Sequence, residues 1–206
     1  MVITQENKEI ARTVLGAFEG KPKVTKYWDD NKSSSIDILS VSDQPQEGIT
    51  SYSTLGLSDH SINYEVNGTP LRVEIVAAME SASDIYANVL STCAFNIINS
   101  NFSCAPGVIF KDVINMYDQE TDMKHVMFVP PFLWEEDLEL LEFSNKNVTW
   151  LMALPISEGE LQVAEQHGPD HLQDLLESKQ IDIFDIKRES VAYITFTFIH
   201  NFYFTK

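Results

Sequence analysis

Apolar residues near the start of the chain recur every three or four positions, which is the spacing that lines one face of an α-helix. They are Ile10, Val14, Leu15 and Phe18. Thr4 is suited to cap the first turn, and Gly20 with Pro22 marks the end of the pattern. We therefore expect an amphipathic helix over residues 5–19 that docks on the rest of the protein.

The period of the pattern falls to two over residues 36–57, which indicates β-strands. Ile36 and Ile38 share one strand face. A second alternating run follows at Ile49, Ser51, Ser53, Leu55 and Leu57. We expect a strand-rich region here.

The strongest local signal is a β-hairpin, because residues 62–66 and 71–77 alternate on either side of Asn67-Gly68. That pair suits the positive φ angles of a type I′ turn. Pro70 has no N–H to donate, so the start of the second strand is expected at a sheet edge.

A second helix is expected after Ser81-x-x-Asp84, which is a capping signature. Its apolar stripe consists of Ile85, Val89, Leu90, Cys93, Ile97 and Ile98. Cys93 therefore belongs to the buried face, as a small hydrophobic residue and not a nucleophile. Cys104 is the other cysteine, and no cationic leader precedes the first helix. We expect reduced thiols and a cytoplasmic location, with a disulfide as the alternative.

Three apolar runs, at residues 107–117, 125–134 and 148–156, predict further strands. The last run is apolar at nearly every position, which is typical of a strand that is buried on both faces.

Two helices are expected next. Ser157-x-x-Glu160 is a capping box, and the helix that it opens is expected to stop at Gly168. Pro169 is suited to the first turn of a following helix, whose apolar residues are Leu172, Leu175 and Leu176. Residues 181–186 then alternate again, which predicts a strand.

These elements predict a single α+β domain, in which a mixed or antiparallel sheet is packed with several helices. No internal repeat, linker or low-complexity tract divides the 206 residues. We place the domain at residues 1–191. Residues 192–206 are an apolar C-terminal extension, either a terminal strand or appended sequence, and they are too short and too polar to span a membrane.

Charge narrows the possible partners. The chain carries 14 basic and 31 acidic side chains, for a formal net charge of −17. The first 32 residues hold six basic and five acidic side chains, so the remaining residues carry a net charge of −18. Such a field repels nucleic acid and anionic membranes and attracts basic proteins. Solubility alone is the competing explanation for an acidic surface.

The acidity is densest directly after Trp134, where no basic residue interrupts the run. The carboxylates there are Glu135, Glu136, Asp137, Glu139 and Glu142. Together with Asp29 and Asp30, they are candidate protein-binding residues, with Trp28, Trp134 or Tyr52 as aromatic anchors. A merely solvated face is the alternative interpretation of such a charge run.

The motifs of common catalytic sites are missing from the sequence, including the P-loop, G-x-G-x-x-G, G-x-S-x-G and H-E-x-x-H. His167 and His171 have the spacing of two metal ligands on a helix, but Gly168-Pro169 breaks the helix between them. We therefore expect no catalytic residues, no metal and no cofactor. An enzyme of unrecognised type, which would use paired carboxylates with His125 or His167, is the alternative.

Two stretches of the second half carry a family resemblance. They are Trp150-Leu151-x-x-Leu154-Pro155-Ile156-Ser157-x-x-Glu160 and, after the leucine-bearing helix, Ile181-Asp182-Ile183-Phe184-Asp185-x-x-Arg188-x-x-Val191. On these residues the chain resembles the suppressor-of-fused-like domain family. In the first half, TKYWDD, SSSIDILSVSD, GITSYSTLGLSDH and LRVEIVAA are similar to the bacterial members that serve as antitoxins or immunity proteins. The family pattern stops near Val191.

The resemblance implies a non-catalytic protein that binds and neutralises a cognate secreted toxin, which in that group is often a DNase of the LXG type made by the same cell. The carboxylates would then occlude the basic active-site or DNA-binding surface of the toxin. The alternative is a regulatory scaffold that binds another cytoplasmic protein, as the animal members of the family hold a transcription factor.

Overall fold

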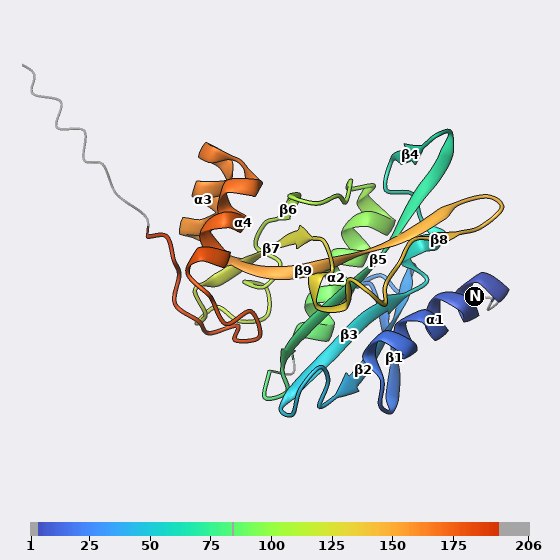
Figure 1. Ribbon diagram of the computed structural model, residues 1–206, viewed down its shortest axis with the longest axis horizontal. Helices are drawn as coiled ribbons and strands as arrows, with labels where there is room; N and C mark the ends of the chain where they lie inside the picture. The colour runs from blue at the N-terminus through green and yellow to red at the C-terminus, as the bar shows by residue number, and fades with distance from the viewer. Residues whose placement is uncertain (1–3, 84, 194–206) are drawn as a thin grey trace, which may run out of the picture.

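A mixed β-sheet forms the centre of the protein, and helices pack on both of its faces (Figure 1). The structure is a computed structural model that describes residues 4–83 and 85–193. Within these residues the sheet has nine strands in the order β1-β2-β3-β5-β9-β7-β6, with β4 paired to β5 and β8 paired to β9. Neighbouring strands run antiparallel, except that β5 and β9 run parallel. The expected α+β class is confirmed.

The bounds of the strands are as follows: β1 Pro22–Trp28, β2 Ser35–Ser42, β3 Ile49–Leu55, β4 Tyr64–Val66, β5 Thr69–Glu80, β6 Ile109–Phe110, β7 Met123–Val129, β8 Leu141–Glu142 and β9 Asn147–Ser157. The helices are α1 Gln5–Phe18, α2 Tyr86–Ser100, α3 Glu158–His167 and α4 Pro169–Ser178, with 3₁₀ helices η1 Leu57–Asp59 and η2 Phe132–Trp134.

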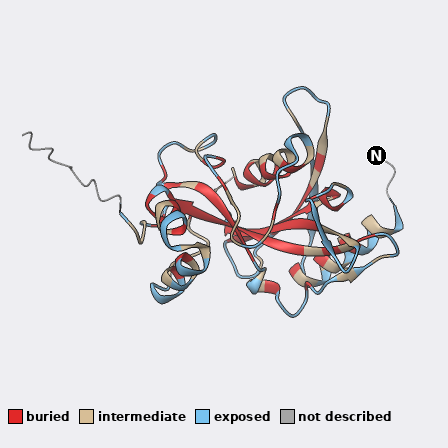
Figure 2. Ribbon diagram, turned by 90° about the horizontal axis from the view of Figure 1, so that it is seen from above, coloured by how far each residue is buried: buried red, intermediate tan, exposed pale blue. Residues whose placement is uncertain are grey.

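Alternation along the central strands creates two separate cores. On β5, Val73 and Ile75 point to the face that α2 covers, whereas Val76 points to the face that α1, α3 and α4 cover. Buried residues therefore follow the middle of the sheet on both sides (Figure 2). The apolar run of β9 is buried on both faces for this reason, as its composition predicted.

Local signals placed several elements correctly. Thr4 caps α1, and its side chain exchanges hydrogen bonds with Asn7 in a full capping box. Asn67 and Gly68 have φ angles of 53° and 80° and join β4 to β5. Pro70 pairs only with β4, because the pairing of β5 with β9 begins at the next residue.

Two expected strands are wrong or shortened. Of residues 107–117, only Ile109–Phe110 pairs in the sheet, and a series of turns follows in which Asp112 has a φ angle of 58°. Residues 181–186 form turns and no strand. The carboxylates of Asp182 and Asp185 each accept a hydrogen bond from the backbone N–H two residues later. Such turns produce the same alternation of acidic and apolar residues as a strand.

Two other boundaries also differ from expectation. The run at residues 125–134 ends as a strand at Val129, because two prolines follow and the chain turns into η2. The second helix begins at Tyr86, and Ile85 occupies the N-cap without a side-chain hydrogen bond. Asp84, which the capping signature invoked, lies outside the described residues, as do residues 194–206 of the expected extension.

Candidate functional site

Trp134 does not form an exposed anchor, contrary to the expectation. Its side chain is only 3% exposed, and its ring lies 4.7 Å from the ring of Phe18 at the end of α1. Leu138 is also buried in the same core. These two residues fix the segment of residues 134–142, which we call the acidic segment, to the face of the sheet that α1 covers.

Backbone hydrogen bonds hold the acidic segment in a tight turn. The carbonyl of Trp134 accepts from the N–H groups of Asp137 and Leu138, at 3.1 and 2.9 Å. The five carboxylates of the segment, at Glu135, Glu136, Asp137, Glu139 and Glu142, are all exposed. Within the described chain, none of them forms an ion pair or a side-chain hydrogen bond.

The basic residue that lies closest in sequence to Glu142 does not neutralise the acidic segment. Lys146 is 6% exposed, and its ammonium group binds Asp59 at 2.9 Å and Glu6 at 3.3 Å. It also donates to the carbonyl of Ser58. Lys146 therefore does not compensate the negative charge of the acidic segment, which faces solvent or a partner.

Asp29 and Asp30 lie in the turn between β1 and β2, away from the acidic segment. Asp29 accepts hydrogen bonds from the backbone N–H of Ser33 at 2.6 Å and from the side chain of Asn99 at 3.2 Å. Asn99 belongs to α2, which covers the opposite face from α1. Asp29 thus stabilises its own turn, whereas Asp30 is exposed and has no described partner. The structure does not bring this pair together with the acidic segment.

The proposed aromatic anchors differ in exposure. Tyr52 is buried, and its ring lies 6.4 Å from that of Tyr86. Trp28, at the end of the edge strand β1, is 55% exposed. Trp28 is therefore the one of the three candidates that a partner can reach directly.

His125 and His167 do not converge, whereas the rings of His167 and His171 lie close together, with centroids 5.2 Å apart. His125 is buried, its Nδ1 accepts from the N–H of Asp112 at 2.8 Å, and its Nε2 lies 3.0 Å from the carboxylate of Glu158. Glu158 begins α3 and His167 ends it, so the two lie roughly 13 Å apart along the axis at 1.5 Å per residue. Among the described residues, no group of three or more His, Cys, Asp or Glu is placed to hold a metal ion.

Both cysteines are free and buried, and the apolar stripe predicted this burial for Cys93. Burial raises the pKa of the Cys93 thiol well above its usual value, and the neighbouring Cys104 adds to the effect. Burial likewise raises the pKa of Cys104. Neither thiol has the lowered pKa of a reactive cysteine.

A fully buried carboxylate, which the sequence pattern did not predict, lies at Glu74 on β5. Its oxygens accept hydrogen bonds from the hydroxyl of Thr54 at 2.6 Å and from the N–H groups of Gly56, Leu57 and Ser58 at 2.9–3.2 Å. Burial raises the pKa of Glu74, and these donors act against that rise. The carboxylate holds the start of η1 against the sheet.

An apolar groove of about 500 Å³, which the sequence did not predict, lies between α4, the ends of β7 and β9 and the chain after α4. Its apolar walls are Val129, Phe132, Leu154, Leu176, Ile181 and Ile183. Phe132 is 49% exposed and lies two residues before Trp134, at which the acidic segment begins. Periodicity could not reveal it, because most of the wall residues also belong to the core pattern.

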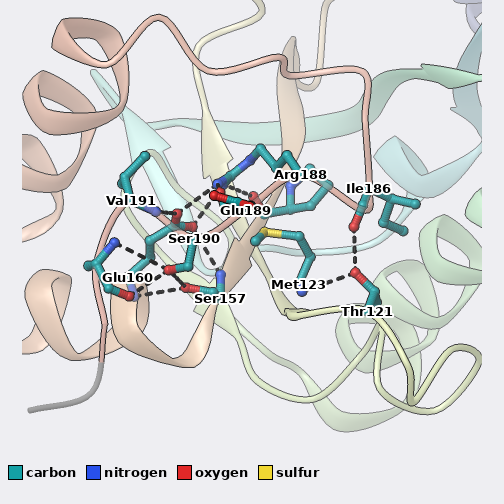
Figure 3. A network of polar contacts seen from close by, with 11 residues as sticks. Thr121, Met123, Ser157, Glu160, Ile186, Arg188, Glu189, Ser190 and Val191 are labelled. Atoms are coloured by element: carbon teal, nitrogen blue, oxygen red, sulfur yellow. Dashed lines mark hydrogen bonds and ion pairs between the residues drawn. The ribbon is translucent and has the colours of Figure 1, made fainter.

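The residues that carry the family resemblance form a polar network inside the protein (Figure 3). Both Glu160 oxygens bind the guanidinium of Arg188, and they also accept from the N–H groups of Ser157 and Val191. Arg188 donates in addition to the carbonyl of Pro155. These residues are structural, since they join the chain after α4 to the start of α3.

Comparisons with known proteins agree with this architecture. Residues 32–189 match the family described as suppressor of fused protein (SUFU). The immunity protein YqcF of Bacillus subtilis (strain 168) is 93% identical over 192 residues, which cover 93% of this chain and 100% of that protein. None of the helices in the described part of the chain is long and apolar enough to cross a membrane.

Solved structures share the fold at low sequence identity. A suppressor of fused homologue from Neisseria gonorrhoeae FA 1090 superimposes with a TM-score of 0.68 at 14% identity, over 92% of this chain and 98% of that chain. A chain of the Sufu–Fu complex superimposes with a TM-score of 0.61 at 11% identity, over 89% of this chain and 91% of that chain. Drosophila Suppressor of Fused gives 0.61 at 11% identity, over 88% of this chain and 50% of its own. These similarities show the shared fold, and the match of residues 32–189 shows that the chain belongs to the suppressor of fused protein family.

Proposed function

We propose that this chain is an immunity protein, which protects its own cell by binding and neutralising a toxin protein in the cytoplasm. The observation that carries the proposal is the 93% identity to a protein named as an immunity protein. The described part of the chain supports a binding role, because its most concentrated charge lies on a well-anchored surface.

The toxin that fits this surface is basic. Exposed carboxylates without cationic partners attract lysine- and arginine-rich surfaces and speed their encounter. A nuclease has such a surface, because it must bind phosphates. Because the family resemblance implies a DNase of the LXG type, we propose such a nuclease as the target, with the acidic segment occupying the place of the nucleic-acid backbone.

The anchoring of the acidic segment contributes to this mechanism. Trp134 and Leu138 fix the turn before any partner arrives, so little conformational entropy is lost on binding. Asp30, in the turn between β1 and β2, and Trp28, at the end of β1, are exposed and are secondary candidates for contact. Asp29 is a weaker candidate, because its carboxylate already stabilises a turn.

Co-expression tests the proposal. If a toxin gene neighbours the gene of this chain, cells that produce that toxin should grow when the chain is also produced, and a pull-down should recover the two proteins together. Continued killing by the toxin, despite abundant folded chain, would show that the function is wrong. A regulatory scaffold is the second candidate, and the absence of any neighbouring toxin gene would favour it.

A further inference from the structure

The apolar groove beside α4 has an acidic rim. Three polar residues line it, Gln173, Glu177 and Gln180, and Glu177 alone among the lining residues carries a charge. Glu177 is exposed and forms no ion pair with any described residue. The nearby carboxylates of Asp174 and Asp182 are also exposed and without ion pairs in that part of the chain.

The groove and the acidic segment are joined by one short 3₁₀ helix, η2. Phe132 belongs to the wall of the groove, and the carboxylate of Glu135 follows three residues later, directly after η2. An incoming segment that reaches both must therefore carry an apolar side chain next to positive charge. Protein interfaces concentrate their binding energy in such arrangements, where a buried anchor is surrounded by a polar rim.

We propose that this groove receives an aliphatic or aromatic side chain from a basic segment of the partner, with flanking lysines or arginines paired to Glu177 and to the acidic segment. The inference rests on the proposed immunity function and adds an apolar anchor to it. The charges provide fast association, whereas the groove provides slow dissociation.

A second copy of the chain does not fit this surface. Each copy has a net charge of −17, and the rim of the groove is acidic. Placing two such surfaces together opposes association, because like charges repel across an interface. The occupant is therefore a cationic protein segment.

A peptide experiment tests the groove without the toxin. The probe is a synthetic amphipathic peptide of leucine and lysine, and its control has glutamine in place of every leucine, so that the charge is the same. We expect the leucine peptide to bind about tenfold more tightly or better, which is the effect of roughly one good apolar anchor. In methyl NMR spectra, the bound peptide should shift the signals of Leu154, Leu176, Ile181 and Ile183.

Two variants and one matched control refine the test. Gln173→Phe fills the groove, and Glu177→Lys reverses the charge of its rim, so each should weaken binding of the leucine peptide by about tenfold. Asp174→Lys, on the same helix but outside the lining, should weaken both peptides equally and by less than about threefold. Circular dichroism should show that all three variants are folded.

Several results would overturn the inference. Equal binding of the two peptides, or methyl shifts elsewhere, would show that charge alone holds the peptide. Equal shifts caused by an uncharged apolar solute would indicate a small-molecule site, and a concentration-dependent dimer that Gln173→Phe abolishes would indicate a second copy.

If the wild-type chain and Gln173→Phe protect cells from the toxin equally, the proposed role of the groove is wrong and the immunity function stands. If the wild-type chain gives no protection, the proposed function fails, whatever the peptides do.

Discussion

The guanidinium of Arg188 binds both oxygens of the Glu160 carboxylate, with N–O distances of 2.7 and 2.8 Å, inside the protein (Figure 3). Glu160 is fully buried and Arg188 is 8% exposed. Because Glu160 also completes the capping box with Ser157, one carboxylate joins the start of α3 to the chain that follows α4. These residues, which carry the family resemblance, thus stabilise the fold.

Loss of Arg188 should be costly. Arg188→Ala leaves the Glu160 carboxylate buried without its cation, so we expect the free energy of unfolding to fall by about 3–5 kcal/mol in urea titrations. Lys26→Ala is the matched control, because Lys26 pairs with Asp37 at 2.7 Å at an exposed site. That change should cost about 1 kcal/mol or less. Equal losses in the two variants would contradict the structural role of Arg188.

Two helical glycines should respond in opposite directions to alanine. At Gly159 in α3, an added Cβ would collide with the backbone carbonyl of Ala192, whereas at Gly16 in α1 nothing lies within 4 Å. Gly16→Ala should therefore stabilise the protein by about 0.5–1 kcal/mol through helix propensity. Gly159→Ala should destabilise it, as measured by thermal unfolding. Stabilisation by both would show that residue 192 does not pack on α3.

The pKa of Glu74 predicts a pH dependence of stability. Because burial raises this pKa, the folded protein binds the proton more tightly than the unfolded chain does. The free energy of unfolding should therefore fall as pH rises from the usual range of a glutamate toward the raised value. Glu74→Gln should remove this contribution to the dependence of the free energy of unfolding on pH. It should also lower the free energy of unfolding by about 1–3 kcal/mol, because the amide group of the glutamine faces N–H donors.

Urea titrations from pH 4 to pH 7 measure the effect of Glu74. Glu120→Gln, at an exposed position, is the control and should keep the wild-type slope. An unchanged slope in Glu74→Gln would show that this carboxyl group titrates alike in both states.

The two thiols should be inert in the folded protein. Because burial raises the pKa of Cys93 and of Cys104, both stay protonated at pH 8 and out of reach of reagents. Ellman's reagent should detect no thiol in the native protein and two thiols in denaturant. Rapid reaction of one thiol under native conditions would contradict its burial.

Local sequence signals predicted the elements whose causes are local. Ser157 and Glu160 are three residues apart, and Asn67-Gly68 needs only its own φ angles, so both elements could be recognised without tertiary information. The alternation of residues 181–186 wrongly predicted a strand, because the structure of this segment does depend on tertiary contacts. Its aspartates form turns, and the choice between turn and strand depends on whether a neighbouring strand is available.

The candidate site could be predicted in part. Five carboxylates without a basic neighbour in sequence do remain exposed and unpaired within the described chain. The burial of Trp134 could not be foreseen, because it depends on Phe18, which lies more than a hundred residues earlier. The groove beside α4 depends in the same way on three separate stretches of the chain, at residues 129–132, 154 and 173–183.

The central claim is that the acidic segment binds the toxin. Its most direct test is the association rate of the purified cognate toxin with two charge-matched variants. One variant reverses Glu135, Glu136 and Asp137 to lysine, and the control reverses the exposed residues Glu47, Glu120 and Asp122.

Both triple variants change the net charge of the chain equally, so they differ only in where the charge is lost. We predict that the first slows association by about tenfold or more at low salt, while the control stays within about threefold of wild type. Equal rates for the two variants would contradict the assigned surface, and no binding by the wild-type chain would contradict the function itself.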